Sequence, residues 1–156
     1  MTEDALVRRC AVLVEDAHAA LLPDHELDPL PEAVEVALAC FDEALELLAP
    51  RRGAGRDELV VSAREGRGTA LSMLGRYEEA LAVQRAIVDE PVTAEDGEVV
   101  DALVDGAWLL GELGRVDAGI VWSLRAIRTV GVDPEPSLRF RARSARSLLE
   151  DLLRWR

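Results

Sequence analysis

Two segments of the chain that lie 39 residues apart follow one pattern, with Leu, Gly, Arg, an apolar residue, an acid and a small residue in register. The first runs from Leu71 to Leu81 and the second from Leu110 to Ile120. Each glycine stands where a helix needs a residue at positive φ to stop, which costs a residue with a Cβ about 1 kcal/mol or more. A repeat of this period is typical of stacked helical hairpins, because each hairpin buries its apolar stripe only against a neighbour.

Apolar residues recur at helical spacing along the chain, and no segment alternates over a strand's length. The sequence therefore predicts an all-α fold with seven helices and no sheet. The expected ranges are about Asp4–Leu22, Pro31 to the break at Pro50, Asp57–Leu74, Arg76–Glu90, Thr93–Leu113, a sixth helix ending at Gly131, and Pro136–Trp155. In the sixth helix, Ile120, Leu124 and Ile127 are expected to face the core.

The first copy of the pattern resembles the tetratricopeptide repeat. The resemblance lies in the order Leu74, Gly75, Tyr77 and Ala80, with Gly68 seven residues upstream of the turn glycine. It covers roughly residues 31–130, and its spacing of 39 exceeds the family's usual period of about 34. The helices or loops are thus expected to be longer than in the family consensus.

The other copies depart from the family pattern, since the second has Val116 in place of the tyrosine and Gly119 in place of the alanine. A fainter third copy is the segment 41–50. The resemblance implies one domain over residues 1–156, a right-handed stack of three hairpins with a capping helix. Its expected parts are a divergent hairpin over 1–50, repeats over 56–91 and 93–131, and the cap over 135–156.

In the family that the repeats resemble, the first helix of each hairpin lines a concave face that binds protein or peptide ligands. Counting back from each turn glycine, the resemblance places eight residues on that face: Glu65, Thr69, Ser72, Met73, Asp101, Val104, Trp108 and Glu112. Trp108 has two interpretations, as a half-buried core residue or as an exposed binding residue among acids.

The charge of the chain limits its partners. Its net charge is −12, with 12 Arg and 28 acids in residues 1–136 but 6 Arg and 2 acids in residues 137–156. An acidic body repels phosphate, so nucleic-acid binding is disfavoured, and a basic or amphipathic protein partner is expected. No apolar run is long enough for a membrane span, and the first four residues are unlike a signal peptide, so a cytoplasmic protein is expected. All basic residues are Arg, which suggests a GC-rich bacterial genome.

The sequence predicts neither an enzyme nor a cofactor or metal site. The serines lie on helices without a nucleophile motif, and Cys10 and Cys40 lie in helical stripes as small apolar residues. The Arg- and Gly-containing loop 51–56 lacks the ending and the preceding strand of a phosphate loop. His18 and His25 lie among acids in residues 15–28, with no metal-binding spacing.

Two alternatives to a protein-binding scaffold stay open. In one, Arg8, Arg9 and His18 of the first helix close a small-molecule or catalytic pocket with Trp108, and a deep enclosed cavity would favour it. In the other, the chain is a self-association module that acts through Trp155 and the basic last helix, giving a homo-oligomer.

Overall fold

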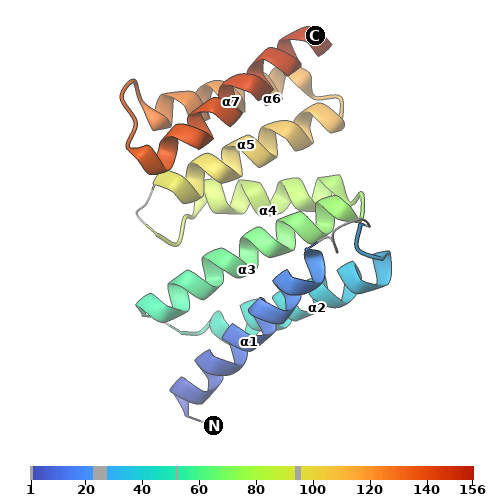
Figure 1. Ribbon diagram of the computed structural model, residues 1–156, viewed down its shortest axis with the longest axis vertical. Coiled ribbons are helices and arrows are strands. Elements are labelled where there is room, and N and C mark those ends of the chain that lie inside the picture. Colours follow the sequence, from blue (N-terminus) through green and yellow to red (C-terminus); the bar gives the residue numbers. More distant parts are fainter. Residues whose placement is uncertain (1, 23–27, 52, 94–95) are drawn as a thin grey trace. The chain divides into compact units, whose positions relative to one another are not determined.

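The predicted apolar stripes all form helices (Figure 1). The computed structural model describes residues 2–22, 28–51, 53–93 and 96–156, and within these ranges it contains seven α-helices and no strand. The all-α prediction is confirmed. The helices are α1 (Glu3–Leu21), α2 (Pro31–Leu48), α3 (Ala54–Met73), α4 (Tyr77–Asp89), α5 (Asp96–Glu112), α6 (Val116–Val130) and α7 (Pro136–Trp155).

The two repeated turns have the same hydrogen-bonded geometry. Gly75 and Gly114 have φ values of 70° and 73°, as the sequence predicts. The Gly75 amide donates to the Ser72 carbonyl at 3.0 Å, and the following amide of Arg76 donates to Leu71 at 2.9 Å. The second turn repeats both bonds, 39 residues later. These bonds satisfy the last carbonyls of α3 and α5, so each turn is a Schellman motif that ends its helix.

The chain divides into two compact units, and each is described by itself. Unit 1 comprises residues 1–76 and contains α1, α2 and α3, which pack against one another in all three pairs. Unit 2 comprises residues 77–156 and contains α4 to α7. In unit 2, α5 packs against α4, α6 and α7, and α6 also packs against α7. The border follows the Gly75 turn, inside the segment expected to form the repeat 56–91.

The centre of unit 1 is an aromatic ring held against a glycine. Phe41 of α2 is fully buried, and a Cβ built on Gly66 of α3 would lie 2.2 Å from its Cζ atom. Only a residue without a side chain allows this approach, so α2 and α3 pack closely at Gly66. His18 of α1 packs edge-on against the same ring, with centroids 4.9 Å apart. Cys10 is buried, Cys40 is half-buried, and both are free thiols.

Unit 2 also packs large side chains on glycines. A Cβ on Gly106 of α5 would lie 2.3 Å from the Trp122 ring of α6. Leu152 of α7 fills the space beside Gly111 and Gly119, at 2.8 and 3.2 Å from their built Cβ positions. Trp155 also packs on Gly111, although 52% of it is exposed.

The core side of α6 differs from the predicted one. The buried residues are Gly119, Ser123, Ala126 and Val130, whereas Leu124 is 47% exposed. The small residues face inward because α6 packs closely on α5 and α7, where larger side chains would not fit. The prediction for Leu124 was therefore wrong.

Candidate protein-binding surface

One line of residues on α5 combines acids with an exposed aromatic ring. Asp101, Asp105, Trp108 and Glu112 are spaced i, i+4, i+7 and i+11, which places them on one side of a helix. Asp101 is half-buried and the other three are exposed. We call these four residues the α5 ridge. Three of them were predicted from the sequence. The fourth, Asp105, was not, although its distance of four residues from Asp101 is a signal that could have found it.

Trp108 is partly packed and partly open. Its exposed fraction is 37%. Its ring meets Tyr77, the first residue of α4, in an edge-to-face contact with centroids 5.7 Å apart and an interplanar angle of 79°. This contact holds the indole in one orientation, and the exposed remainder of the ring is available to another molecule. Trp108 is thus neither fully buried in the core nor without a contact to the rest of the protein.

The ridge belongs to an acidic helix. Residues 96–112 contain five acids and no basic residue. One acid is partly neutralised, because the Asp101 carboxylate accepts a hydrogen bond from Arg141 Nε of α7 at 2.7 Å. Burial by the surrounding protein and repulsion from Asp101 raise the pKa of Asp105 to about 6, although its side chain keeps contact with solvent.

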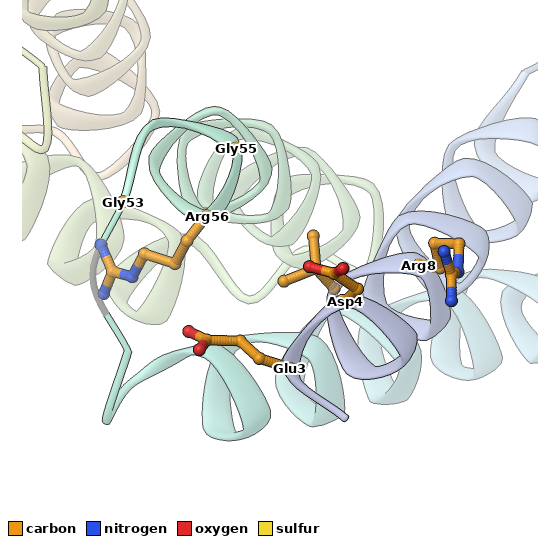
Figure 2. A pocket seen from close by; sticks show the side chains of 7 residues that line it. Glu3, Asp4, Arg8, Gly53, Gly55 and Arg56 are labelled. Atoms are coloured by element: carbon orange, nitrogen blue, oxygen red, sulfur yellow. The ribbon is translucent and has the colours of Figure 1, made fainter. Parts of the chain in front are cut away.

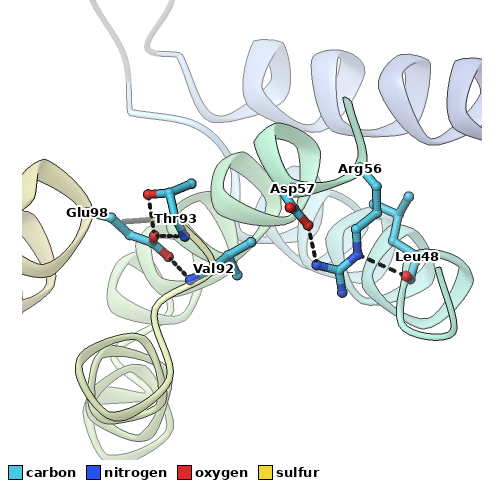
Figure 3. A network of polar contacts seen from close by, with 6 residues as sticks. All are labelled: Leu48, Arg56, Asp57, Val92, Thr93 and Glu98. Carbon is cyan, nitrogen blue, oxygen red and sulfur yellow. Dashed lines mark hydrogen bonds and ion pairs between the residues drawn. The ribbon is translucent and has the colours of Figure 1, made fainter. Parts of the chain in front are cut away.

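Glu98 of the same helix binds the residues that precede α5. Its buried carboxylate accepts hydrogen bonds from the Val92 amide at 3.2 Å and from the Thr93 amide and hydroxyl at 3.0 Å (Figure 3). The bonds hold Val92 and Thr93 to the first turn of α5, and they satisfy the buried carboxylate. The helix thus begins at Asp96, three residues after the start expected at Thr93.

The four predicted site residues of unit 1 lie together on α3. Glu65, Thr69, Ser72 and Met73 follow helical spacing on one side of the helix. The hydroxyls of Thr69 and Ser72 donate to the carbonyls four residues earlier, at 3.1 and 2.9 Å, so their donors are already used. Met73 is 44% exposed and is the apolar member of this group. In unit 2 the remaining predicted residue, Val104, is half-buried on α5.

Unit 1 has an open pocket between the start of α1 and the start of α3 (Figure 2). Its volume is about 410 Å³, and its lining residues are Glu3, Asp4, Val7, Arg8, Gly53, Gly55 and Arg56. The Arg56 guanidinium is already bound to its surroundings, donating to the Leu48 carbonyl at 3.2 Å and to Asp57 at 2.8 Å (Figure 3). None of the described lining residues is a Ser, Thr, Cys or His, and the acidic groups of the pocket are the Glu3 and Asp4 carboxylates.

The other members of the proposed first-helix pocket have different partners. Arg9 pairs with Glu43 of α2 at 2.5 Å. The His18 Nε2 atom lies 3.1 Å from the Ser62 carbonyl and 3.0 Å from its hydroxyl. With a proton on Nε2 the ring donates to the Ser62 carbonyl, and with a bare Nε2 it accepts from the Ser62 hydroxyl. In either tautomer the His18–Ser62 contact joins α1 to α3.

Two other segments contain residue types that bind ligands in other proteins. The loop before Gly53 follows helix α2 and not a strand, unlike a phosphate loop. Residues 24–26 of the acidic and histidine segment lie outside the described residues. Among the described residues, His, Cys, Asp and Glu side chains form no group that could hold a metal ion. None of the described helices has the length and apolar character that a bilayer-spanning helix requires.

Comparison with protein-family models, with curated proteins and with solved structures gave no match to this chain. The function must therefore be inferred from the residues described above.

Proposed function

We propose that the chain is a tetratricopeptide-like interaction module whose α5 ridge binds a basic, amphipathic segment of a partner protein. The observation that carries the proposal is the partly exposed Trp108 between two exposed acids, Asp105 and Glu112. Tryptophan anchors and arginine contacts contribute most of the binding energy in many protein interfaces. A basic side chain over the indole face would gain a cation–π contact as well as attraction to the acids.

The charge of unit 2 supports a basic partner over an acidic one. All charged residues of α5 are acidic. Acidic side chains of a partner brought against this helix would cost several kcal/mol. An apolar component is also expected in the partner, because the exposed part of Trp108 gains free energy only when it is removed from water. The open shape of the unit 1 pocket favours an interaction module over an enzyme, because small-molecule sites are usually concave clefts that enclose most of the ligand.

Calorimetric titration of the full chain with synthetic peptides tests this function. The probes are an amphipathic helical peptide of Leu and Arg, the same peptide with Glu in place of Arg, and a scrambled Leu/Arg peptide. The Leu/Arg helix is expected to bind best, and its affinity is expected to fall as salt shortens the Debye length to about 8 Å. Equal binding of the Glu peptide, or indifference to salt, would contradict the proposal.

A pair of variants locates the binding site. Trp108→Ala is expected to weaken peptide binding by about tenfold or more, as for an interface hot spot. Val121→Ala is the control, since Val121 is an apolar residue of the same unit with 61% exposure but lies on α6. Equal loss in both variants, or no loss in Trp108→Ala, would place the site elsewhere.

A further inference from the structure

Helix α7 has two sides of different chemistry. Ala142, Ala145 and Leu152 are buried, and Arg141 extends to Asp101 of α5. The other side is exposed and carries four arginines against one acid, Glu150. We call this side the α7 solvent face, and its arginine and apolar residues are Arg139, Phe140, Arg143, Arg146, Leu153 and Arg154. Their spacing places them within about 140° of the helix circumference.

The apolar residues of the α7 solvent face are unusually open. Phe140 is 73% exposed and Leu153 is 52% exposed. Burying such side chains at an interface is favourable, because their apolar surface is removed from water. Near them, Arg143 and Arg146 form no ion pair with any described residue. This face therefore has the basic and amphipathic character that the α5 ridge is expected to bind.

We propose that the α7 solvent face of one copy of this chain docks on the α5 ridge of a second copy. The proposal rests on the proposed function, because it names the partner of the same ridge. The charges are complementary: unpaired Arg143 and Arg146 meet Asp105 and Glu112, and Phe140 supplies an apolar partner for Trp108. No other segment of similar length is as basic, since residues 137–156 carry 6 Arg and 2 acids.

Docking within one copy is prevented by the fold. Arg141, which contacts Asp101 of α5, lies on the opposite side of α7 from the solvent face. The face thus points away from the ridge of its own chain. Because the ridge and the face are different surfaces, the association is head-to-tail, and it forms a ring or an open chain according to the rotation between copies.

Sedimentation of the full-length chain over a wide range of concentration tests the proposal. The mass is expected to rise above the 17.0 kDa monomer as the concentration increases. Two charge-reversed variants, Arg143→Glu/Arg146→Glu and Asp105→Arg/Glu112→Arg, are each expected to associate at least about tenfold more weakly. An equimolar mixture of the two is expected to associate again, because each variant then offers a surface complementary to the other.

A second acidic helix provides the matched control. Glu32 and Glu46 are exposed acids of α2, and Glu32→Arg/Glu46→Arg changes the net charge as much as the ridge variant does. It is expected to leave association unchanged. Far-UV circular dichroism confirms that each variant keeps its helices. Phe140→Ala, which alters no charge, is expected to weaken association by about tenfold.

Three results would overturn the proposal: a wild-type chain that stays monomeric, a mixture of reversed variants that fails to associate, or an α2 variant that is weakened as much as the ridge variant. Binding of a DNA oligonucleotide by Arg143 and Arg146 without self-association would assign the α7 solvent face to a different occupant. In each of these cases, binding of the Leu/Arg peptide to the ridge would still support the proposed function, and its loss would reject that function separately.

Discussion

At the residue scale, two of three glycines have a physical reason to be glycine, and the third has none. A Cβ on Gly55 or on Gly75 meets no atom within 4 Å, whereas one on Gly66 would overlap the Phe41 ring. Only Gly75 of the three has a positive φ. The cost of adding a side chain should therefore come from backbone conformation at Gly75, from packing at Gly66, and from neither at Gly55.

Thermal and denaturant unfolding of three single variants checks this difference. Gly75→Val is expected to destabilise by about 1–2 kcal/mol, because a β-branched residue is forced into the left-handed region. Gly66→Ala is expected to cost about 1–3 kcal/mol, since the fully buried Phe41 ring must move. Gly55→Ala should be neutral or stabilise by up to about 1 kcal/mol, as expected for glycine in a helix. Equal stability of all three variants would show that the turn and the contact are misplaced.

The titration of Asp105 should make stability depend on pH. Its pKa of about 6 in the folded chain exceeds its ordinary value of 3.8, so the folded state binds the proton more tightly. Stability from this group is complete below about pH 4 and is lost as pH rises through about 6. Asp105→Asn should therefore be more stable than wild type at pH 7–8, and the difference should vanish toward pH 4.

Solvent contact limits this effect to the order of 1 kcal/mol. Chemical unfolding at a series of pH values measures it. Glu112→Gln, which removes an exposed charge from the same side of α5, is the control for a change in net charge. An Asp105→Asn curve parallel to that of wild type would mean that Asp105 titrates in an ordinary environment.

At the scale of elements, adjacent residues of α7 lie in different environments, one in the core and one in solvent. Leu152 is fully buried beside Gly111 and Gly119, and Leu153 is 52% exposed. Leu152→Ala should cost about 2–4 kcal/mol, since a cavity would remain in unit 2. Leu153→Ala should change stability by about 0.5 kcal/mol or less. Denaturant unfolding at low protein concentration compares them, and equal losses would show that α7 packs with a different side.

The border between the two units places two helix turns of the same sequence pattern in different settings. The turn at Gly75 lies at the end of unit 1, and the turn at Gly114 joins α5 to α6 within unit 2. Both have the same hydrogen bonds. Turn geometry is therefore a local property of the Leu-Gly-Arg sequence.

Net charge acts on the whole molecule. At −12 the chain repels itself, and its ion pairs, such as Arg9–Glu43 with side chains 54% and 44% exposed, are open to water and contribute little. Raising ionic strength from about 0.01 to 0.15 M shortens the Debye length from about 30 to 8 Å. The melting temperature should then rise by about 2–4 °C for each kcal/mol of repulsion removed.

The control for this prediction is Glu32→Gln/Glu46→Gln, which reduces the net charge without touching the α5 ridge. Its melting temperature should respond less to salt than that of wild type. A wild-type melting temperature that falls with added salt would show that the ion pairs outweigh the general repulsion.

The sequence by itself determined the helices and their ends. Apolar spacing located all seven, and proline and glycine marked their limits within a few residues, because a helix depends on bonds between residues four apart and a turn depends on the φ of one residue. The resemblance to the repeat family, with a count back from the turn glycine, placed Asp101, Trp108 and Glu112 on one face of the same helix. These are properties of a single segment.

Only the tertiary structure decided what each helix side contacts. The buried face of α6 contains the small residues Gly119, Ser123 and Ala126. The apolar pattern of the sequence does not identify this face, because close helix packing selects side chains by their small volume rather than by their hydrophobicity. The half-exposure of Trp108 depends on Tyr77, which is 31 positions earlier in the sequence. The raised pKa of Asp105 depends on the protein packed around it. Such properties arise between segments that are distant in sequence, and helical periodicity contains no information on which of them meet.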